Sequence, residues 1–515
     1  MATLSLLAVL AGCSGDDVGG IRTVTRPNVL VVIVDDLASG STGAWSDVSP
    51  ALPTPHMDRL AARGTIFRSA LCPSPNCTPS RQAFLTGRWP HSIRVTQVLS
   101  ILPPDTPTMA TVFGQAGYAT AAFGKMHWMR RKLLRSAAPG ADLDHGLDHG
   151  FDLVVDEIEW REQLDPSETQ AYEAYRAPIW GRQDREGWSM HNVGRSACPL
   201  PEERQLAPFL LERAIAFMSS PRDRPFLTFL SFYEPHAPFT FPERLREVVD
   251  ADALTLPPVD LAQLEREVPG LAQTVRHQAG TKGELTPEIV RGATASYLSS
   301  VAWLDEQLGC LDEFLESSGL RENTIVVFWS DNGYFLGERG LLGKNYPYRE
   351  AAEVPLAICG PGIPRGSTRQ LVQAIDIFPT LCELCGVPAP DYLEGRSLVP
   401  TLSSDAPVRD QAYTEFVGLA AALRTSRWKL HLGASASLGL DQLYDLQGDP
   451  AETQNLFAIP EHADVVRDLV GRMYDLLKSS PPDAPLRAGW MPNPDHMRAV
   501  RWALSQIEEY EVKFR

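Results

Sequence analysis

The stretch NVLVVIVDD, residues 28–36, places an unbroken apolar run directly before two aspartates. A run of this length that is rich in β-branched residues is typical of a strand buried on both faces, as in parallel sheets covered by helices. The sequence therefore predicts an α/β fold around a largely parallel sheet. Three further stretches have the same character and also end in polar residues: YATAAFGK (118–125), RPFLTFLSFYEPH (224–236) and NTIVVFWSDNG (323–333).

Segments with helical spacing lie between these strands. TPHMDRLAARG (54–64) and PTMATVFGQAG (107–117) each end at a glycine, and residues 293–319 have the length and periodicity of one long helix. The pattern changes after residue 402, where AALRTSRWKLHL (421–432) and DQLYDLQGDPAETQNL (441–456) predict antiparallel strands, followed by a helix from residue 460. We expect a leader and spacer over residues 1–24, an α/β domain over 25–402 with an insertion at 237–290, and a smaller α+β subdomain over 403–515.

The composition limits the class of protein. Of the 515 residues, 44% are hydrophobic and 22% are charged, which is ordinary for a folded globular chain. The formal net charge of −17 argues against a nucleic-acid partner, although local positive charge can still gather around an anionic substrate. The eight cysteines are too few for a disulfide framework, and Cys382 and Cys385 lie in a helical pattern that favours core packing over redox or zinc chemistry.

The first twenty residues, MATLSLLAVLAGCSGDDVGG, have the form of a secretory leader and are too short to span a bilayer. The letters LAGC (10–13) resemble the bacterial lipoprotein cleavage box, which predicts a lipidated Cys13 and a membrane tether. A basic segment before the apolar run is missing, so a disordered leader is the alternative. We expect an exported protein, periplasmic or at the cell surface, anchored through Cys13.

Polar residues follow the predicted strands at their carboxyl ends, which in open α/β sheets is where the ligand site lies. Carboxylate and amide oxygens there are hard ligands that suit Ca²⁺ or Mg²⁺ rather than zinc. A pair of aspartates after a strand is also common as a loop cap. The presence of Asp331 and Asn332 at the end of a second strand is what favours a metal site. The candidate ligands are Asp35, Asp36, Asp331 and Asn332.

Cations and histidines join this group. Arg81, Lys125 and Lys344 can hold a tetrahedral anion, although a lone lysine or arginine is ordinarily a solvated surface charge. His127 and His236 are the natural proton carriers near neutral pH, and their positions at strand ends beside lysines favour a catalytic over a structural role.

Cys77 lies in SPNCTPSRQAFLTGR (74–88), which predicts a helix with Thr78 as N-cap, Pro79 at its first position and Gly87 at its end. Cys77 would then stand just ahead of a helix N-terminus, where the helix dipole lowers the pKa of a thiol. A thiolate nucleophile, a metal ligand and a buried apolar side chain are all open interpretations. A cysteine hydrolase, however, needs no cluster of hard metal ligands.

The same stretch resembles a family signature. CTPSR followed by LTG is similar to the C-x-P-S-R-x-x-x-L-T-G signature of the type I sulfatases, in which the cysteine is converted to formylglycine. The resemblance covers most of the chain. It implies the alkaline-phosphatase-like fold, a large mixed, mostly parallel sheet flanked by helices, plus a smaller C-terminal α+β subdomain with an antiparallel sheet. Further matching segments are NVLVVIVDD, TPHMDRLAARGTIF, FGKMHW, EPHAPF, SDNGYFLGERGLLGKNYPYREAAEVPL and RTSRWKL…LYDLQGDPAETQNL.

The resemblance also implies roles for the candidate residues. One divalent cation, Ca²⁺ most often in the family and Mg²⁺ as the alternative, would bind Asp35, Asp36, Asp331, Asn332 and residue 77. Formylglycine made from Cys77 by a maturation enzyme would be hydrated and act as nucleophile. Arg81 would hold the hydrated group and His127 would take its remaining proton. Lys125, His236 and Lys344 would bind the sulfate and stabilise charge on the leaving oxygen.

The implied activity is that of a sulfuric ester hydrolase acting on a sulfated carbohydrate or an aryl sulfate. A phosphonate or phosphate monoester hydrolase of the same superfamily is the alternative, and an inactive surface lipoprotein that binds a sulfated ligand is the third. The chain has Gly337-Glu338-Arg339-Gly340 where the family often has G-E-H-G; if that His position lines the substrate mouth, Arg339 would change the charge of the mouth and add an anion contact there. Substrate selectivity is expected in residues 128–205 and 237–290, with a lining that includes Trp128, Arg130, Arg131, Trp160 and His191.

Overall fold

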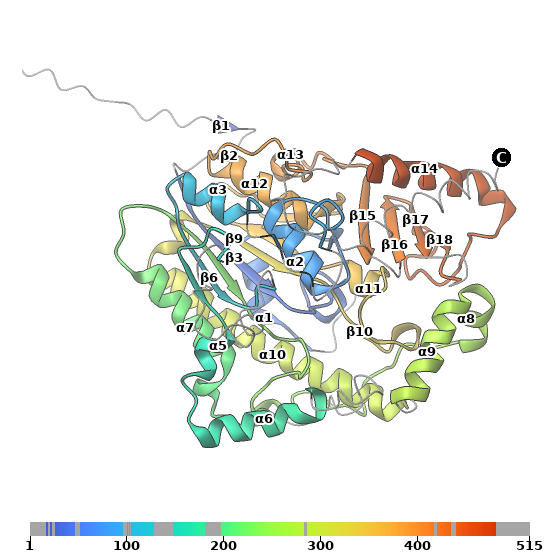
Figure 1. Ribbon diagram of the computed structural model, residues 1–515, viewed down its shortest axis with the longest axis horizontal. Coiled ribbons are helices and arrows are strands. Elements are labelled where there is room, and N and C mark those ends of the chain that lie inside the picture. Colours follow the sequence, from blue (N-terminus) through green and yellow to red (C-terminus); the bar gives the residue numbers. More distant parts are fainter. Residues whose placement is uncertain are drawn as a thin grey trace, which may run out of the picture.

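The computed structural model is shown in Figure 1. It describes residues 17–18, 21–22, 26–46, 52–95, 100, 102–103, 105–127, 148–180, 197–282, 286–416, 420–433 and 439–479. Outside these described residues lie Cys13, Trp128, Arg130, Arg131 and His191, for which the sequence-based predictions stand as made.

A mixed sheet of 8 strands forms the centre of the molecule. Neighbouring strands run parallel except β12, which is antiparallel to both of its neighbours. The mostly parallel sheet predicted from the sequence is thus confirmed. In spatial order the strands are β13 (Gly366–Thr368), β4 (Gly64–Phe67), β12 (Leu356–Cys359), β9 (Thr324–Ser330), β3 (Asn28–Val34), β8 (Phe226–Ser231), β6 (Ala119–Gly124) and β7 (Leu153–Val155).

The position of β3 in the sheet explains why residues 29–34 are all apolar. Leu30 and Val32 pack into the core on one face of the sheet, and Val29, Val31 and Ile33 pack into the core on the other. Alternate side chains of a strand point to opposite faces, so only a strand covered on both sides needs to be apolar throughout.

Helices cover both faces of this sheet (Figure 1). The core on one face includes residues of α1 (Pro55–Ala61), α7 (Leu206–Ser219) and the long helix α10 (Pro287–Ser317). The core on the other face includes α2 (Cys77–Thr86), α3 (Met109–Gln115) and α12 (Ile377–Leu384), where Cys382 and Cys385 are buried as core residues. The helices predicted from spacing are therefore present, and α10 begins earlier than expected because Thr286 caps it.

The start of α2 differs from the prediction. The helix begins at Cys77 itself, with Asn76 in extended backbone as the preceding cap residue, so Thr78 is not the N-cap. Gly87 ends the helix in the left-handed conformation at a φ of 65°, as expected for a C-terminal glycine. Cys77 consequently occupies the first turn of the helix and not the residue before it.

The remaining elements lie around this framework. One of them, α5 (Glu157–Arg161), carries Trp160, which was expected to line the substrate site. Trp160 is instead buried in the core, where its Nε1 donates to the Arg204 carbonyl at 2.9 Å, so that expectation was wrong. The insertion at 237–290 contains α8 (Leu261–Glu267) and α9 (Pro269–Lys282). Other elements are β1 (Asp17–Val18), β2 (Ile21–Arg22), β5 (Ala70–Leu71), β10 (Phe335–Leu336), β11 (Leu342–Gly343), β14 (Val372–Gln373), α6 (Pro166–Trp180), α11 (Arg349–Ala352) and α13 (Val399–Ser404).

A second, antiparallel sheet forms the C-terminal subdomain. Its strands follow chain order, β15 (Gln411–Phe416), β16 (Ala420–Thr425), β17 (Trp428–Gly433) and β18 (Gln442–Asp445), and α14 (Ala463–Ser479) packs against it (Figure 1). This confirms the small α+β part predicted from the sequence, while the boundary at residue 402 stays a prediction. Among the described residues, no helix has the length and apolar character needed to cross a membrane.

A buried ion pair joins this subdomain to the segment after α2. The His91 Nδ1 lies 2.8 Å from Glu415 Oε1, and both side chains are buried. Burial alone would lower the pKa of His91, but the Glu415 carboxylate outweighs it and raises that pKa above its ordinary value of 6.5. Burial raises the pKa of Glu415, but His91 outweighs it and lowers that pKa below its ordinary value of 4.5.

We therefore expect the pair to stabilise the fold most between pH 4.5 and 6.5. The contribution of His91 is lost as the pH rises through its raised folded-state pKa, and that of Glu415 is lost as the pH falls through its lowered one. Denaturant unfolding of the wild type and Glu415→Gln should differ by about 2 kcal/mol near pH 6 and by clearly less near pH 9. A difference that stays constant or grows toward pH 9 would contradict this assignment.

Candidate active site

The carboxyl ends of four neighbouring strands meet at one edge of the central sheet. Strand β3 pairs in parallel with β9 up to Val34 and Ser330, and with β8 up to Ile33 and Ser231. Residues that follow these strands must therefore lie side by side. The structure brings all predicted site residues to this edge: Asp35 and Asp36 after β3, Lys125 and His127 after β6, His236 after β8, Asp331 and Asn332 after β9, Lys344 beyond β11, and Cys77 and Arg81 on α2.

The carboxylates form a buried, hydrogen-bonded group. The Asp36 N–H donates to Asp331 Oδ1 at 3.1 Å, and the Asn332 Nδ2 donates to Asp36 Oδ1 at 2.7 Å. Asp35, Asp36, Asp331 and Asn332 are each at most 1% exposed. Packing three carboxylates this closely away from water requires compensating positive charge.

Arg81 and the two lysines supply that charge. The Arg81 Nε donates to Asp331 Oδ2 at 2.5 Å, while its Nη1 donates to the Lys125 carbonyl and to Ser231 Oγ. The ammonium group of Lys125 pairs with Asp35, and that of Lys344 pairs with Asp36. The ionised forms of three carboxylates are thus matched by three cations.

The neighbouring cations shift the pKa values of the aspartates. Burial raises the pKa of Asp35 and of Asp36, but Lys125 at the first and Lys344 at the second outweigh burial, and both pKa values lie below the ordinary value. Burial dominates at Asp331, whose pKa is raised even though Arg81 opposes the shift.

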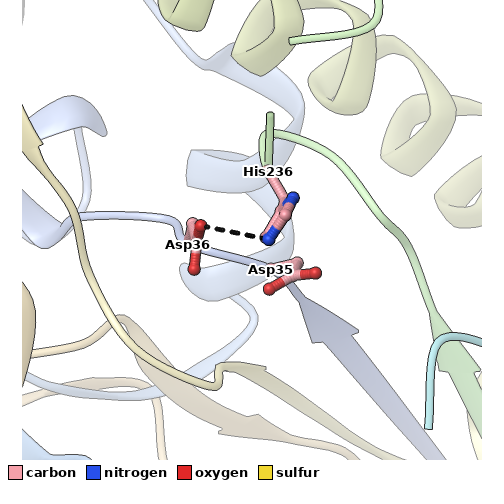
Figure 2. A group of neighbouring side chains, drawn as sticks. All are labelled: Asp35, Asp36 and His236. Carbon is pink, nitrogen blue, oxygen red and sulfur yellow. Dashed lines mark ion pairs between the residues drawn. The ribbon is translucent and has the colours of Figure 1, made fainter. Parts of the chain in front are cut away.

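His236 faces the first two aspartates (Figure 2). Its Nε2 lies 3.8 Å from Asp36 Oδ2, and ligand atoms of Asp35, Asp36 and His236 all lie within 4.8 Å of one another. The His236 Nδ1 is 2.5 Å from the Ala237 carbonyl, which only accepts hydrogen bonds. The Nδ1 therefore carries a hydrogen, and in the neutral ring Nε2 presents its lone pair to the site.

Helix α2 places Cys77, Arg81 and His127 relative to one another. Cys77 is 4% exposed, and Arg81 follows it by one helical turn on the same face. The helix also fixes His127, because Thr78 Oγ1 lies 3.3 Å from His127 Nδ1 and Gln82 Nε2 donates to its carbonyl at 2.7 Å. Burial, with Lys125 next, holds the pKa of His127 well below the ordinary value, so this ring is a neutral base at physiological pH.

Two positioning side chains were not identified from the sequence. The Tyr297 hydroxyl donates to the Asp36 carbonyl at 2.8 Å and accepts from the Ala38 N–H at 2.9 Å, and Ser330 Oγ accepts from the Leu37 N–H at 3.0 Å. These bonds hold the turn that carries Asp36, whose φ of 66° is unusual for a residue other than glycine. Tyr297 lies on the apolar face of α10, where its spacing indicates only a core residue.

The oxygen donors fit a divalent cation. Among the described residues, Asp35 Oδ1 and Asn332 Oδ1 are buried acceptor atoms with no hydrogen-bond partner. Buried oxygens without a hydrogen bond are costly, and a hard cation between the two strand ends would satisfy both, although Asp35 Oδ1 also lies 3.8 Å from Arg81 Nη2. The donor set is all oxygen apart from the adjacent His236, which favours Ca²⁺ or Mg²⁺ over softer metals.

Comparison with known families agrees with this arrangement. Residues 27–387 match a family model described as Sulfatase, which covers well over half of the chain. Residues 337–479 match a second model described as N-sulphoglucosamine sulphohydrolase, C-terminal. The second match spans the Lys344 loop and the C-terminal subdomain.

Individual proteins give the same picture. The choline-sulfatase of Rhizobium meliloti (strain 1021) is 28% identical over 461 residues, 85% of this chain and 84% of the relative. The phosphonate monoester hydrolase of Agrobacterium radiobacter has a TM-score of 0.74 at 24% identity, over 88% of this chain and 96% of that one. A structure in complex with its substrate D-glucosamine-2-N,6-O-disulfate has a TM-score of 0.66 at 22% identity, over 90% and 100%. The predicted alkaline-phosphatase-like fold is thus confirmed.

We expect Tyr297→Phe to weaken divalent-cation binding about 10-fold, because the turn that presents Asp36 loses both bonds to the hydroxyl. Calorimetric titration with Ca²⁺ measures this effect. Tyr118→Phe is the matched control, since Tyr118 is equally buried and donates to the Pro27 carbonyl at 3.1 Å, at the opposite end of the sheet. Equal Ca²⁺ affinity in Tyr297→Phe and the wild type would contradict the positioning role.

Proposed function

The chain belongs to the sulfatase family and is an enzyme that hydrolyses sulfate esters, and from this premise we propose its nucleophile, its metal and its substrate class. Cys77 is the precursor of a formylglycine, which a maturation enzyme produces. One divalent cation, most readily Ca²⁺, binds beside it. The substrate is a sulfated carbohydrate or an aryl sulfate.

The observation that carries the proposal is the position of Cys77. It begins a buried helix at the edge where carboxylates and cations gather, and Arg81 lies one turn away. Burial lowers the pKa of Lys344, but Asp36 and, next in size, Cys77 outweigh it and raise that pKa well above its ordinary value, which supports a role for Cys77 and Lys344 in one site. A plain thiolate nucleophile would have no use for the neighbouring oxygen ligands.

The oxygens of Asp35, Asp36, Asp331 and Asn332 would hold the cation together with residue 77. When bound, the cation supplies charge that polarises a sulfate oxygen, and the hydrated aldehyde of formylglycine supplies one hydroxyl to attack sulfur and another that lets sulfate leave. The two buried oxygens without a hydrogen-bond partner support this ligand set.

The other side chains then act on the sulfate group directly. The ammonium groups of Lys125 and Lys344 end beside Asp35 and Asp36, from where each would donate to a sulfate oxygen. One of Lys125, His236 and Lys344 would donate the proton to the leaving oxygen, while the others stabilise its charge. Because Nε2 of the neutral His236 ring carries the lone pair, His236 would be the donor only in its doubly protonated form. His127 would accept the proton of the remaining hydroxyl, and its lowered pKa supports that role as a base.

The substrate class rests on the comparisons and not on the site alone. The C-terminal match to N-sulphoglucosamine sulphohydrolase and the fold shared with a protein bound to a sulfated glucosamine support a sulfated sugar. Choline sulfate belongs in the same assay because of the choline-sulfatase relative, and a phosphonate monoester because of the shared fold. Export and tethering through Cys13 complete the proposal, supported by the leader motif alone.

Replacing Cys77 should remove turnover and leave the fold intact. We expect Cys77→Ala to lower kcat for a sulfate ester at least about 10³-fold, since the nucleophile is lost. Cys72→Ala is the matched control, because Cys72 is also buried in the same segment and its Sγ donates to the Ala351 carbonyl at 3.6 Å. Cys77→Ser should at most accept sulfate without releasing it.

Steady-state assays on p-nitrophenyl sulfate, sulfated glucosamines, choline sulfate and a phosphonate monoester would measure these effects. Turnover by Cys77→Ala within a few-fold of Cys72→Ala would overturn the proposed nucleophile. A preference of the wild type for the phosphonate over every sulfate ester would overturn the proposed substrate class.

A further inference from the structure

The loop between β9 and β12 carries both Lys344 and Arg339, and the side chain of Arg339 makes contacts within this loop. Arg339 follows Gly337 in a short 3-10 turn (Glu338–Gly340) and has a φ of 55°. Its guanidinium carbon lies 4.0 Å from the centre of the Tyr348 ring, and its Nη2 lies 3.8 Å from Glu350 Oε2. Arg339 therefore contacts two residues on the far side of Lys344.

The same guanidinium reaches the C-terminal subdomain. Its Nη1 donates to the Glu452 carbonyl at 2.8 Å, and its Nη2 donates to the Ala451 carbonyl at 2.9 Å. The Arg339 side chain is 11% exposed. Arg339 therefore turns toward the C-terminal sheet, and its guanidinium is bound there instead of making the anion contact at the substrate mouth that the family pattern suggested.

The surface that receives Arg339 is buried, charged and internally hydrogen-bonded. Glu452 is 1% exposed, and its Oε1 accepts from the buried Lys429 Nζ at 2.6 Å, which ties the turn at 449–452 to strand β17. The Arg349 Nη1 adds a bond to the Pro450 carbonyl at 3.0 Å. A guanidinium with two carbonyls, two carboxylates and an aromatic ring around it has a single favourable geometry.

The opposite side of the loop is tied to the nucleophile segment. The N–H of Asn345 donates to the Pro75 carbonyl at 3.0 Å, and its Oδ1 accepts from Asn76 Nδ2 at 2.8 Å. Lys344 thus lies between an attachment to the residues just before Cys77 and the attachment of Arg339 to the C-terminal subdomain. The loop also makes apolar contacts, in which Phe335, Leu341, Tyr346 and Tyr348 pack with Leu271, Leu440 and Tyr444. The Tyr348 hydroxyl in addition donates to Gln442 Oε1 at 2.6 Å.

We propose that Arg339 is a positioning residue that docks the Lys344 loop on the C-terminal subdomain and so sets where the Lys344 ammonium group meets the substrate. The proposal rests on the role given to Lys344 above. A lysine side chain has many rotamers, and holding its backbone fixed limits the volume that Nζ explores. A displacement of about 1 Å at a catalytic group can cost about 100-fold in rate.

A double-mutant cycle with Lys344→Ala separates positioning from general stability. We expect Arg339→Met to lower kcat/KM for a sulfate ester by about 10- to 100-fold in the wild-type background. In the Lys344→Ala background the same substitution should cost less than about 2-fold, because the group that it positions is gone. Arg339→Lys, which keeps the charge but reaches fewer acceptors, should fall between the wild type and Arg339→Met.

Arg409→Met is the matched control for the loss of a buried arginine. Arg409 also joins two parts of the chain, through Asp376 Oδ2 at 3.0 Å and Gln373 Oε1 at 3.1 Å, and contacts no residue of the Lys344 loop in the hydrogen bonds and ion pairs of the described residues. Its effect on kcat/KM should be the same with and without Lys344. Thermal unfolding of each variant checks that the assays compare folded proteins.

The outcomes distinguish this inference from the proposed function. Equal losses from Arg339→Met in both backgrounds would overturn the positioning role and leave the proposed function standing. No loss from Lys344→Ala itself would overturn the role of Lys344 and this inference with it. If Arg339→Met does not fold, the same cycle with Arg339→Lys decides between coupling and additivity.

Discussion

The site depends on the parallel pairing of β3 with β8 and β9. Because the three strands end level with one another, Asp35, Asp36 and Asp331 are brought together in a region that excludes water. Carboxylates so close repel each other, and the arrangement holds only because Arg81, Lys125 and Lys344 bring equal positive charge from three other segments of the chain. The fold thus buries a cluster of ion pairs between these aspartates and cations. A bound divalent cation and an anionic ester would take over some of these pairings.

This charge balance links the two sheets. Lys344 belongs to a loop that Arg339 attaches to the C-terminal subdomain, and the His91–Glu415 pair joins that subdomain to the segment following α2. Helix α2 in turn carries Cys77 and Arg81 and fixes His127 through Thr78 and Gln82. The C-terminal sheet is consequently part of the structure that holds the reacting groups, although it contributes none of the candidate ligands.

Much of this could be predicted from the sequence because the signals were local. The apolar run before Asp35 identified a strand buried on both faces, and the polar residues after each strand identified the site, since parallel strands share an edge. Two predictions failed where a long-range contact decided the outcome. In the sequence, Arg339 and Trp160 are candidates for the substrate mouth. In the structure, Arg339 donates to the carbonyls of Ala451 and Glu452, and Trp160 donates to the carbonyl of Arg204. The role of Tyr297 was not predicted, because its spacing in the sequence indicates only a core residue of a helix. The structure shows that its hydroxyl donates to the Asp36 carbonyl and so holds the Asp36 turn.

The central claim is that residue 77 is a formylglycine, and the mass of one peptide tests it directly. Trypsin releases Ser69–Arg81, which contains both Cys72 and Cys77, from enzyme co-expressed with a maturation enzyme. After alkylation, the account predicts that Cys72 carries the label and that residue 77 does not, with a mass about 18 Da below that of the thiol form. Two alkylated cysteines in an enzyme that turns over sulfate esters at its full rate would contradict the account.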